Sequence, residues 1–374
     1  MPASPELDAR AIDHPLEGDA DRRVRIYEVG PRDGLQNEPT PVPTETKLGY
    51  IRLLLDAGLR EIEATSFVSP RAIPQLADAD ELLPRLDRPP GVRYPVLVPN
   101  LRGLERAERA GADAIAVFTA ATDAFTERNI GRTVAESLAA FRPVLERAAG
   151  LGWWRRGYVS TAFGCPYTGS VRPERAVEVG LRLWELGVDE VCFGDTIGVG
   201  VPSQVGEIAG RAVEAGIPRT GLAFHFHDTR GTALANVVAG LEAGVRCFDA
   251  ASGGTGGCPY APGAAGNLGT EDLVYLLDRL GFEHGVSLEG VLRAARFITR
   301  ALGRPLATKV GQAGGWDPTT GRPIGRAPDA EAAPGAEPMA PEAGASEDGV
   351  SGAGARGARS DPTEAPARSG QRSC

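Results

Sequence analysis

Hydrophobic positions along the chain follow two alternating spacings. Short runs rich in Val, Ile, Phe and Tyr are typical of buried strands, and each is followed by a stretch in which apolar residues recur every three or four positions. The predicted strands are 24–29, 60–64, 94–98, 114–118, 157–161, 190–193, 222–226 and 246–249. The predicted helices are 44–57, 72–84, 101–110, 132–150, 173–187, 202–216, 230–243 and 270–281.

Capping signals support these helix boundaries. Thr133 and Glu136 have the spacing of a capping box, and Pro202 lies at the start of a predicted helix. Glycines follow several helices, at Gly58, Gly111, Gly187 and Gly244. An open doubly wound sheet would carry a phosphate-binding glycine loop after its first strand, whereas here the segment from Gly30 reads Gly-Pro-Arg-Asp-Gly. The alternation therefore predicts an α/β fold, a closed (β/α)₈ or TIM barrel.

The two ends of the chain differ in composition from the middle. Residues 1–23 are polar and contain several prolines, which predicts a flexible arm. From residue 313 to residue 374 the chain is rich in Gly, Ala, Pro, Glu, Arg and Ser, with few large apolar residues, which predicts a disordered tail. The predicted domain organisation is thus an arm over 1–23, a barrel over 24–312 and a tail over 313–374.

Composition excludes several classes of function. The 374 residues carry a formal net charge of −9, which disfavours a nucleic-acid surface, and no stretch approaches the roughly 20 apolar residues of a membrane helix. The five cysteines form no CxxC, and the first residues contain acids and no apolar signal core. We therefore expect a cytoplasmic protein with reduced thiols, no membrane association and no nucleic-acid partner.

The ends of the predicted strands carry the candidate chemistry, because the loops that follow barrel strands form one mouth. A single acid at a strand end is often only the cap of the next helix. The pair His225 and His227 is more specific, because residues i and i+2 of a strand face the same side. Asp33 follows the first strand and Asn267 follows the last, so barrel closure brings both near this pair. These nitrogen and oxygen ligands together favour Mg²⁺, Mn²⁺ or a similar cation. The alternative is that the two histidines are a purely structural pair in the core.

Cys258 lies in a segment rich in glycine, Gly253-Gly-Thr-Gly-Gly-Cys-Pro-Tyr. One interpretation is a reactive thiol on a lid that closes over the mouth; the other is an incidental thiol in a tight turn. Cys192 and Cys247 lie inside apolar strands and are expected to belong to the core.

Six segments together resemble 3-hydroxy-3-methylglutaryl-CoA (HMG-CoA) lyase, a family of metal-dependent barrel lyases. They are 28–37 (EVGPRDGLQN), 65–70 (TSFVSP), 194–198 (GDTIG), 225–229 (HFHDT), 256–260 (GGCPY) and 267–275 (NLGTEDLVY). The resemblance extends from about Val24 to Gly303. The RDGLQ and GGCPY segments are specific to it, while HxHDT also occurs in related synthases and aldolases.

The resemblance implies the roles of individual residues. It implies that Asp33, His225, His227 and Asn267 bind the metal, and that the catalytic residues are Arg32, Asp33, Glu63, Asp195, His225 and Cys258. It further implies retro-Claisen cleavage of HMG-CoA to acetoacetate and acetyl-CoA, and a homodimer. Two residues depart from the family pattern, Thr255 and Arg230, where the family more usually has leucine and tyrosine.

Three other functions remain alternatives at this stage. The first is a related acyl-CoA lyase, aldolase or Claisen-condensing synthase, although the synthases usually carry a further C-terminal regulatory domain. The second is a barrel metallohydrolase, which needs more histidine ligands than the four histidines here can supply. The third is a non-catalytic scaffold, which we would expect to have lost at least one of the implied site residues.

Overall fold

The computed structural model describes residues 22–39, 41–256, 266–317 and 320–324, and every structural statement below concerns these residues. Nine parallel strands form its main sheet. They are β1 (Arg25–Glu28), β2 (Glu61–Ile62), β3 (Thr65–Ser66), β4 (Val96–Leu97), β5 (Ala114–Ala120), β6 (Trp154–Ser160), β9 (Glu190–Asp195), β10 (Leu222–Phe226) and β11 (Cys247–Ala250).

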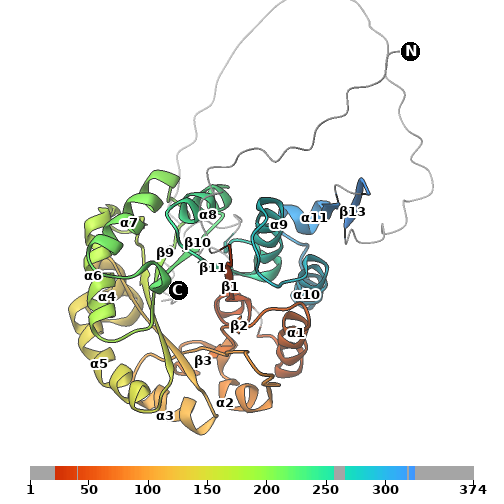
Figure 1. Cartoon of the computed structure of the whole chain (residues 1–374). Coiled ribbons are helices and arrows are strands. Elements are labelled where there is room, and N and C mark those ends of the chain that lie inside the picture. Colours follow the sequence, from red (N-terminus) through yellow and green to blue (C-terminus); the bar gives the residue numbers. More distant parts are fainter. Residues whose placement is uncertain (1–21, 40, 257–265, 318–319, 325–374) are drawn as a thin grey trace, which may run out of the picture. The chain divides into compact units, whose positions relative to one another are not determined.

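The main sheet closes into a ring. Its strand order is β2-β1-β11-β10-β9-β6-β5-β4-β3, and every pair in it is parallel. The two end strands, β2 and β3, are consecutive pieces of residues 61–66, so this one segment pairs with β1 on one side and with β4 on the other. The predicted TIM barrel is thus confirmed (Figure 1).

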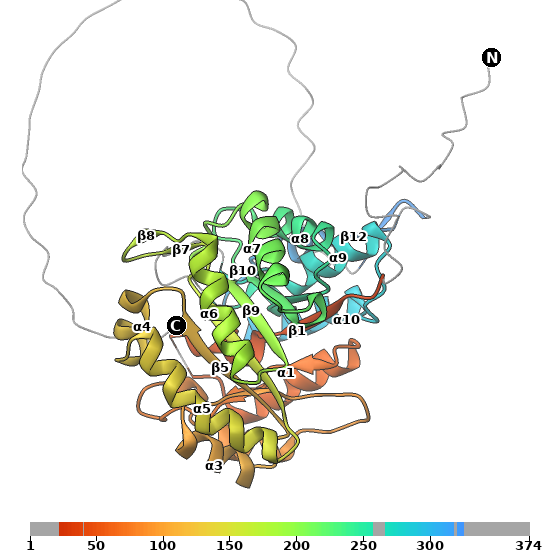
Figure 2. The same cartoon turned by 60° about the vertical axis from the view of Figure 1, so that its left-hand side comes forward.

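Helices surround the ring of strands. They are α1 (Thr44–Asp56), α2 (Ala79–Leu82), α3 (Leu101–Arg109), α4 (Asp123–Ile130), α5 (Val134–Gly150), α6 (Pro173–Glu185), α7 (Pro202–Glu214), α8 (Ala233–Glu242), α9 (Thr270–Leu280), α10 (Leu288–Ala301) and α11 (Lys309–Ala313). Neighbouring outer helices pack on each other, as α6 and α7 do in Figure 2. The capping box of Thr133 and Glu136 is present at the start of α5.

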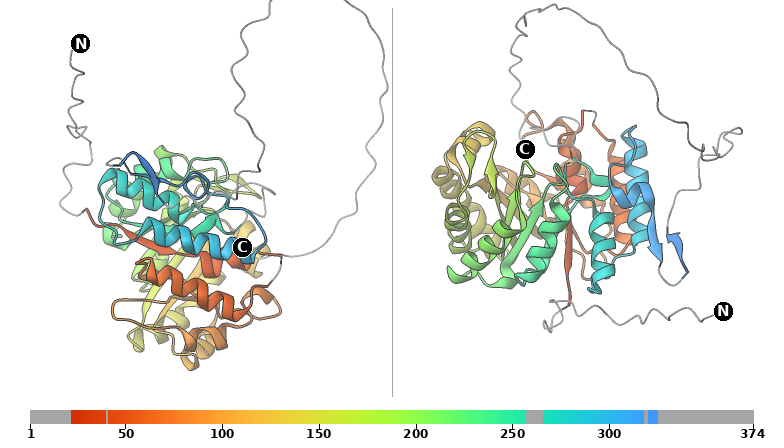
Figure 3. Two further views of the ribbon diagram at one scale, coloured as in Figure 1. Left: turned by 90° about the vertical axis from the view of Figure 1, so that its right-hand side faces the viewer. Right: turned by 90° about the horizontal axis from the view of Figure 1, so that it is seen from above.

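Two regions differ from the predicted helices. Residues 72–84 do not form one helix but three short turns, Pro74–Leu76, Ala79–Leu82 and Leu83–Arg85, because Pro74 and Pro84 each remove a backbone donor. Helix α10 was not predicted, although Ser287 caps it and apolar residues recur along it at helical spacing. It packs along α1 and against residues 252–254, the turn that follows β11 (Figure 3, left).

Alternation along the strands separates two environments. Most outward side chains of the strands are apolar and pack against the helices in one continuous core, with polar exceptions such as Arg155 and Asp195. Inward positions hold a smaller cluster that includes Tyr27, Tyr158, Cys192 and Cys247, as the sequence predicts for the two thiols. Charged side chains share this interior, among them the fully buried Arg156. The barrel is therefore lined by polar groups below its mouth.

Described structure extends past both predicted boundaries of the barrel domain. Arg22 already donates hydrogen bonds to the carbonyl oxygens of Gly281 and Leu280, at 3.0 and 2.5 Å. The predicted boundary at residue 312 falls inside α11, whose first N–H groups bond to Asp272, and a hairpin of β12 (Gly315–Asp317) and β13 (Arg322–Ile324) follows. A polar hairpin needs few large apolar residues, which is why composition did not indicate it. Residues 1–21 of the predicted arm and 325–374 of the predicted tail lie outside the described residues.

Two short strands, β7 (Gly164–Cys165) and β8 (Gly169–Ser170), form a separate antiparallel hairpin. None of the described helices combines the length and the apolar character that a membrane span requires.

Candidate active site

The turn after β1 carries Arg32 and Asp33 to the barrel mouth. Residues Gly30–Gly34 form one π-helical turn, with Pro31 at its start, where a missing N–H sacrifices no helical hydrogen bond. A Cβ atom on Gly34 would lie 2.3 Å from Oγ1 of Thr255. Glycine at this position therefore lets the turn lie directly against residues 252–256.

His225 and His227 face the same space as Asp33. They alternate with the buried, outward-facing Phe224 and Phe226, and their ring centroids are 5.2 Å apart. The metal-ligating atoms of Asp33, His225 and His227 all lie within 4.8 Å of one another. Within the described part of the chain, no other three His, Cys, Asp or Glu side chains come together in this way.

Asn267 completes this cluster from the far end of the chain. Its backbone pairs with that of His227, and its side-chain Nδ2 donates to Oδ2 of Asp33 at 2.9 Å and to the Thr255 carbonyl at 3.0 Å. Two buried acceptor atoms nearby, Oδ1 of Asn267 and Nδ1 of His227, have no hydrogen-bond partner. Since buried acceptors are seldom left unpaired, a bound cation is a natural partner for atoms of this kind.

The electrostatics of the cluster suit cation binding. Burial alone would raise the pKa of Asp33, but the cation of Arg32 and the nearby His225 outweigh burial and lower this pKa to about 2. Burial, together with repulsion from His225, lowers the pKa of His227 to about 3. Asp33 is therefore ionised and His227 neutral at neutral pH, which are the states that bind a metal ion.

Four residues could therefore hold a divalent ion, through two imidazole nitrogens, one carboxylate oxygen and one amide oxygen: Asp33, His225, His227 and Asn267. This mixed nitrogen and oxygen set suits Mn²⁺, Mg²⁺ or a similar cation that keeps positions open for substrate. A closed structural zinc site would require thiolates in their place.

Arg32 is held rigidly beside the cluster. Its guanidinium makes two parallel hydrogen bonds of 3.0 Å to the carboxylate of Glu63 and a third, of 2.8 Å, to Oδ1 of Asp33. The hydroxyl of Tyr158 donates to the same Glu63 carboxylate at 2.7 Å. Glu63 therefore fixes the plane of the Arg32 guanidinium group, and the positive charge of this group lies at the edge of the cavity.

A cavity at the barrel mouth is lined by these groups and by residues from several strand ends. The lining residues are Arg32, Asp33, Asn37, Leu97, Phe118, Tyr158, Ser160, Gly194, Thr196, His225 and His227. Ser160 at the end of β6 and Thr196 directly after β9 thus reach the cavity. Asn100 instead caps α3, accepting the Gly103 N–H at 3.0 Å.

Asp195 does not reach this cavity. It alternates with the inward-facing Cys192 and Gly194 on β9, and its two carboxylate oxygens accept N–H bonds from Val199 and Gly200 at 2.9 and 2.8 Å. Burial raises the pKa of Asp195 despite these bonds. In the described structure the Asp195 carboxylate makes the contacts of a loop cap, and a catalytic role for Asp195 stays a prediction.

Cys258 lies outside the described residues. The segment before it is described as far as Gly256, and Gly253, Gly254 and Gly256 all have positive φ, between 59° and 89°. A Cβ atom on Gly256 would lie 2.7 Å from Nδ2 of Asn267. The described part of the glycine-rich segment therefore ends directly beside the candidate metal ligand Asn267.

Comparisons with known proteins, by sequence and by structure, agree on one family. Residues 23–298 match the HMGL-like family. The chain is 48% identical over 304 residues to the mitochondrial hydroxymethylglutaryl-CoA lyase of Bos taurus, covering 81% of this chain and 93% of that protein. This chain belongs to the HMGL-like family. It is also 48% identical over 290 residues to the cytoplasmic 3-hydroxy-3-methylglutaryl-CoA lyase of Rattus norvegicus, covering 78% of this chain and 84% of that one.

A solved structure extends the comparison to a bound state. An HMG-CoA lyase from Acinetobacter baumannii, in complex with coenzyme A and 3-methylmalate, superposes with a TM-score of 0.76 at 38% sequence identity. The match covers 82% of this chain and 99% of that one. The HMGL-like family is therefore supported by both sequence and fold.

The two departures from the HMGL-like pattern lie outside the cavity lining. Arg230 donates to the carbonyl oxygens of Ile197 and Gly198 at 2.7 and 3.0 Å and so joins the loops after β9 and β10. Thr255 is buried, and its hydroxyl donates to the Ser252 carbonyl at 3.2 Å. Neither side chain is among those that line the cavity.

Sequence reasoning missed several polar residues of this HMGL-like site. Tyr158 lines the cavity, and Asp249 and Arg156 lie beneath it. The sequence did contain a signal for these residues. Arg156 and Tyr158 are two positions apart on one strand and so face the same side of the sheet. Asp249 is a charged residue within an otherwise apolar strand. A charged residue inside a barrel strand indicates a buried polar network.

Proposed function

We propose that this protein cleaves HMG-CoA to acetoacetate and acetyl-CoA. The observation that carries the proposal is the cluster of Asp33, His225 and His227 beside Arg32 at a barrel mouth, in a chain 48% identical to named HMG-CoA lyases. The coenzyme A in the Acinetobacter baumannii complex supports an acyl-CoA substrate. The reaction breaks the C2–C3 bond: the tertiary hydroxyl loses its proton, C3 becomes a ketone, and the electron pair passes to the thioester as an enolate.

The metal centre in this proposal consists of Asp33, His225, His227 and Asn267, with Mg²⁺ or Mn²⁺ as the ion. When bound, such an ion supplies a Lewis acid that lowers the pKa of the substrate hydroxyl and orients it. Asp33 and His225 are the two candidate acceptors for the hydroxyl proton, because both face the cavity next to Arg32.

Arg32 has the catalytic role of stabilising the enolate oxygen as charge develops there. Its orientation by Glu63 before substrate arrives avoids reorganisation during the reaction. Loss of one such preorganised donor typically raises the barrier by about 3–4 kcal/mol. Cys258 is proposed to donate the proton that converts the acetyl-CoA enolate to acetyl-CoA; Glu63 acts through Arg32, and Asp195 through the loop that follows β9.

The substrate proposal is tested by incubating the purified protein with Mg²⁺ or Mn²⁺ and a series of 3-hydroxyacyl-CoA thioesters. The measured products are acetyl-CoA, which cleavage of each ester releases, and acetoacetate, which the 3-methylglutaryl ester releases. We expect turnover of the 3-methylglutaryl ester. Turnover of a different ester, with none of this one, would overturn the substrate and favour a related acyl-CoA lyase.

A homodimer and a cytoplasmic location complete the proposal. The dimer rests on the family resemblance, and light scattering coupled to gel filtration measures it directly. Named relatives include both mitochondrial and cytoplasmic forms, so location rests on the sequence expectation alone. Cell fractionation with antibody detection would decide it.

A further inference from the structure

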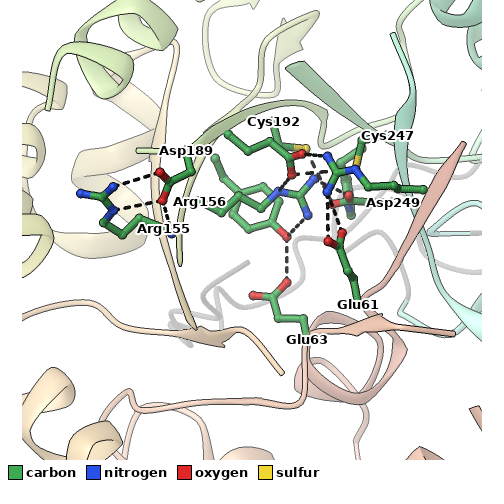
Figure 4. A network of polar contacts seen from close by, with 12 residues as sticks. Glu61, Glu63, Arg155, Arg156, Asp189, Cys192, Cys247 and Asp249 are labelled. Atoms are coloured by element: carbon green, nitrogen blue, oxygen red, sulfur yellow. Dashed lines mark hydrogen bonds and ion pairs between the residues drawn. The ribbon is translucent and has the colours of Figure 1, made fainter. Parts of the chain in front are cut away.

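A single buried cation lies beneath the candidate metal cluster. Arg156 stands at the middle of β6, faces the barrel interior and has no exposed surface. Its neighbour Arg155 points the opposite way and pairs with Asp189 outside the barrel (Figure 4). Arg156 therefore reaches no solvent and is not itself among the residues that line the cavity.

One side of the Arg156 guanidinium leads to a candidate metal ligand. Nη2 donates to Oδ1 of Asp249 at 2.6 Å, and Oδ2 of the same carboxylate lies 3.1 Å from Nδ1 of His225. An ionised Asp249 keeps the proton of His225 on Nδ1, so that Nε2 carries the free lone pair. Arg156 holds the Asp249 carboxylate in place, and this carboxylate sets both the tautomer and the orientation of the His225 ring.

The other side of the guanidinium leads to the catalytic arginine. Nη1 donates to the hydroxyl of Tyr158 at 3.3 Å, and that hydroxyl donates to Oε2 of Glu63 at 2.7 Å. Glu63 holds the fork of Arg32, which in turn bonds to Asp33. Both paths that start at Arg156 thus end at a candidate metal ligand, His225 on one side and Asp33 on the other.

Further contacts immobilise Arg156 itself. Its guanidinium stacks over the ring of Tyr27, 3.7 Å from the centroid, and its Nε lies 3.1 Å from Oε1 of Glu190. Glu190 is also paired with Arg25 at the lower end of the barrel. A planar fork with donors on two edges can bridge two partners at fixed angles, whereas a lysine ammonium cannot.

Stability alone does not explain this arrangement. Buried ion pairs lose much of their attraction to desolvation, and apolar side chains of similar volume often stabilise a core as well or better. The hydrogen bonds of Arg156 are better explained by the two side chains that they orient, Asp249 and Tyr158.

We propose that Arg156 is a positioning residue that sets the geometry of both halves of the active site, His225 through Asp249 and Arg32 through Tyr158 and Glu63. This inference rests on the proposed metal centre. It predicts that the two halves can be uncoupled by separate substitutions, and that both respond when Arg156 is replaced.

The test measures Mn²⁺ affinity by the loss of the free-ion electron paramagnetic resonance signal, together with kcat and KM. Arg156→Lys should weaken Mn²⁺ binding about 10- to 100-fold, which is the usual effect of disturbing a residue behind a metal ligand, and should lower kcat. Asp249→Asn should reproduce the loss of Mn²⁺ affinity. Tyr158→Phe should lower kcat, while Mn²⁺ affinity stays within about twofold because Asn267 still orients Asp33.

Arg155→Lys is the matched control, because it changes the same residue type one position along the same strand, on the outer face. Mn²⁺ affinity and kcat should not change in this variant. The effect of Tyr158→Phe on kcat should also shrink in the Arg156→Lys background, since the path to Glu63 is already broken there. A purely structural Arg156 would leave the two effects additive.

The outcomes separate this inference from the proposed function. If the wild-type protein binds no Mn²⁺, the metal centre itself is wrong. If it binds Mn²⁺ and folded Arg156→Lys keeps both affinity and kcat within twofold, the positioning role is wrong. Should Arg156→Lys fail to fold, the charge-balanced Arg156→Gln/Glu190→Gln variant takes its place, with the same expected losses.

Discussion

Asn267 donates a 2.9 Å hydrogen bond from Nδ2 to the carboxylate of Asp33, across 234 positions of sequence. The bond joins the first and the last loops of the barrel mouth and aligns two of the four proposed ligands. It also leaves the amide oxygen of Asn267 buried without a partner. The side chain therefore has two separate functions, orienting Asp33 and offering an oxygen to a cation.

Replacing Asn267 by alanine should weaken Mn²⁺ binding by at least about tenfold, because one ligand oxygen is lost and Asp33 loses its orienting donor. Titration calorimetry measures this directly. Asn100→Ala is the control: it removes a helix cap at another strand end and should lower stability by about 1 kcal/mol without changing the Mn²⁺ affinity. Equal Mn²⁺ affinity in wild type and Asn267→Ala would remove Asn267 from the ligand set.

Glu28 should make stability fall as the pH rises. Its carboxylate is buried and accepts bonds from Gly30, Ser252 and Thr270, yet burial outweighs these bonds and raises its pKa from 4.5 to about 7. Between pH 4.5 and 7 the folded state holds a proton that the unfolded state has released, so raising the pH favours unfolding. Glu28→Gln removes this penalty. The Tm of the variant minus the Tm of wild type should therefore be a few degrees larger at pH 8 than at pH 5.

An exposed carboxylate provides the control for this pH effect. Bonds from Thr133 lower the pKa of Glu136 below its ordinary value, so this group is ionised in both states across pH 5–8. Glu136→Gln should therefore change Tm by the same amount at both pH values. If the Tm of Glu28→Gln relative to wild type is also independent of pH, Glu28 is ionised in the fold throughout this range.

The barrel could be predicted from the sequence because its signals are local. Each strand is a short apolar run, and the strand of residues 222–226 was predicted to the residue. The ligand cluster followed from strand ends alone, since closure brings Asp33 and Asn267 beside the histidine pair. Helix α10 shows the limit: its apolar residues recur at helical spacing, but eight strand and helix pairs already satisfy the barrel pattern without it.

The polar interior could not be predicted in this way, because it depends on which side chains face inward and meet across the ring. Arg156 and Asp249 are 93 positions apart and bond only because β6 and β11 both line the barrel. Asp195 shows that a place at a strand end does not by itself bring a side chain to the cavity: its neighbour Gly194 lines the cavity, whereas Asp195 is not among the lining residues.

The hairpin of β12 and β13 should contribute measurably to stability. Gly315 is buried against Leu288 of α10, and the preceding α11 is anchored by bonds to Asp272. A chain ending at residue 312 should therefore melt a few degrees below a chain ending at residue 324. Identical melting curves for these two truncations would show that the hairpin adds nothing to the barrel.

Alkylation should distinguish Cys258 from the cysteines inside the barrel. Cys192 and Cys247 are at most 1% exposed, and burial raises the pKa of both thiols well above 9, so neither should react readily with iodoacetamide. If Cys258 donates the final proton, its modification should abolish turnover, bound substrate should slow that modification, and Cys258→Ser should lower kcat by orders of magnitude with little change in KM. Peptide mapping by mass spectrometry, read beside residual activity, measures both. Complete modification of Cys258 with undiminished cleavage would make this thiol a bystander, and another proton donor would then have to be sought among the groups that line the cavity.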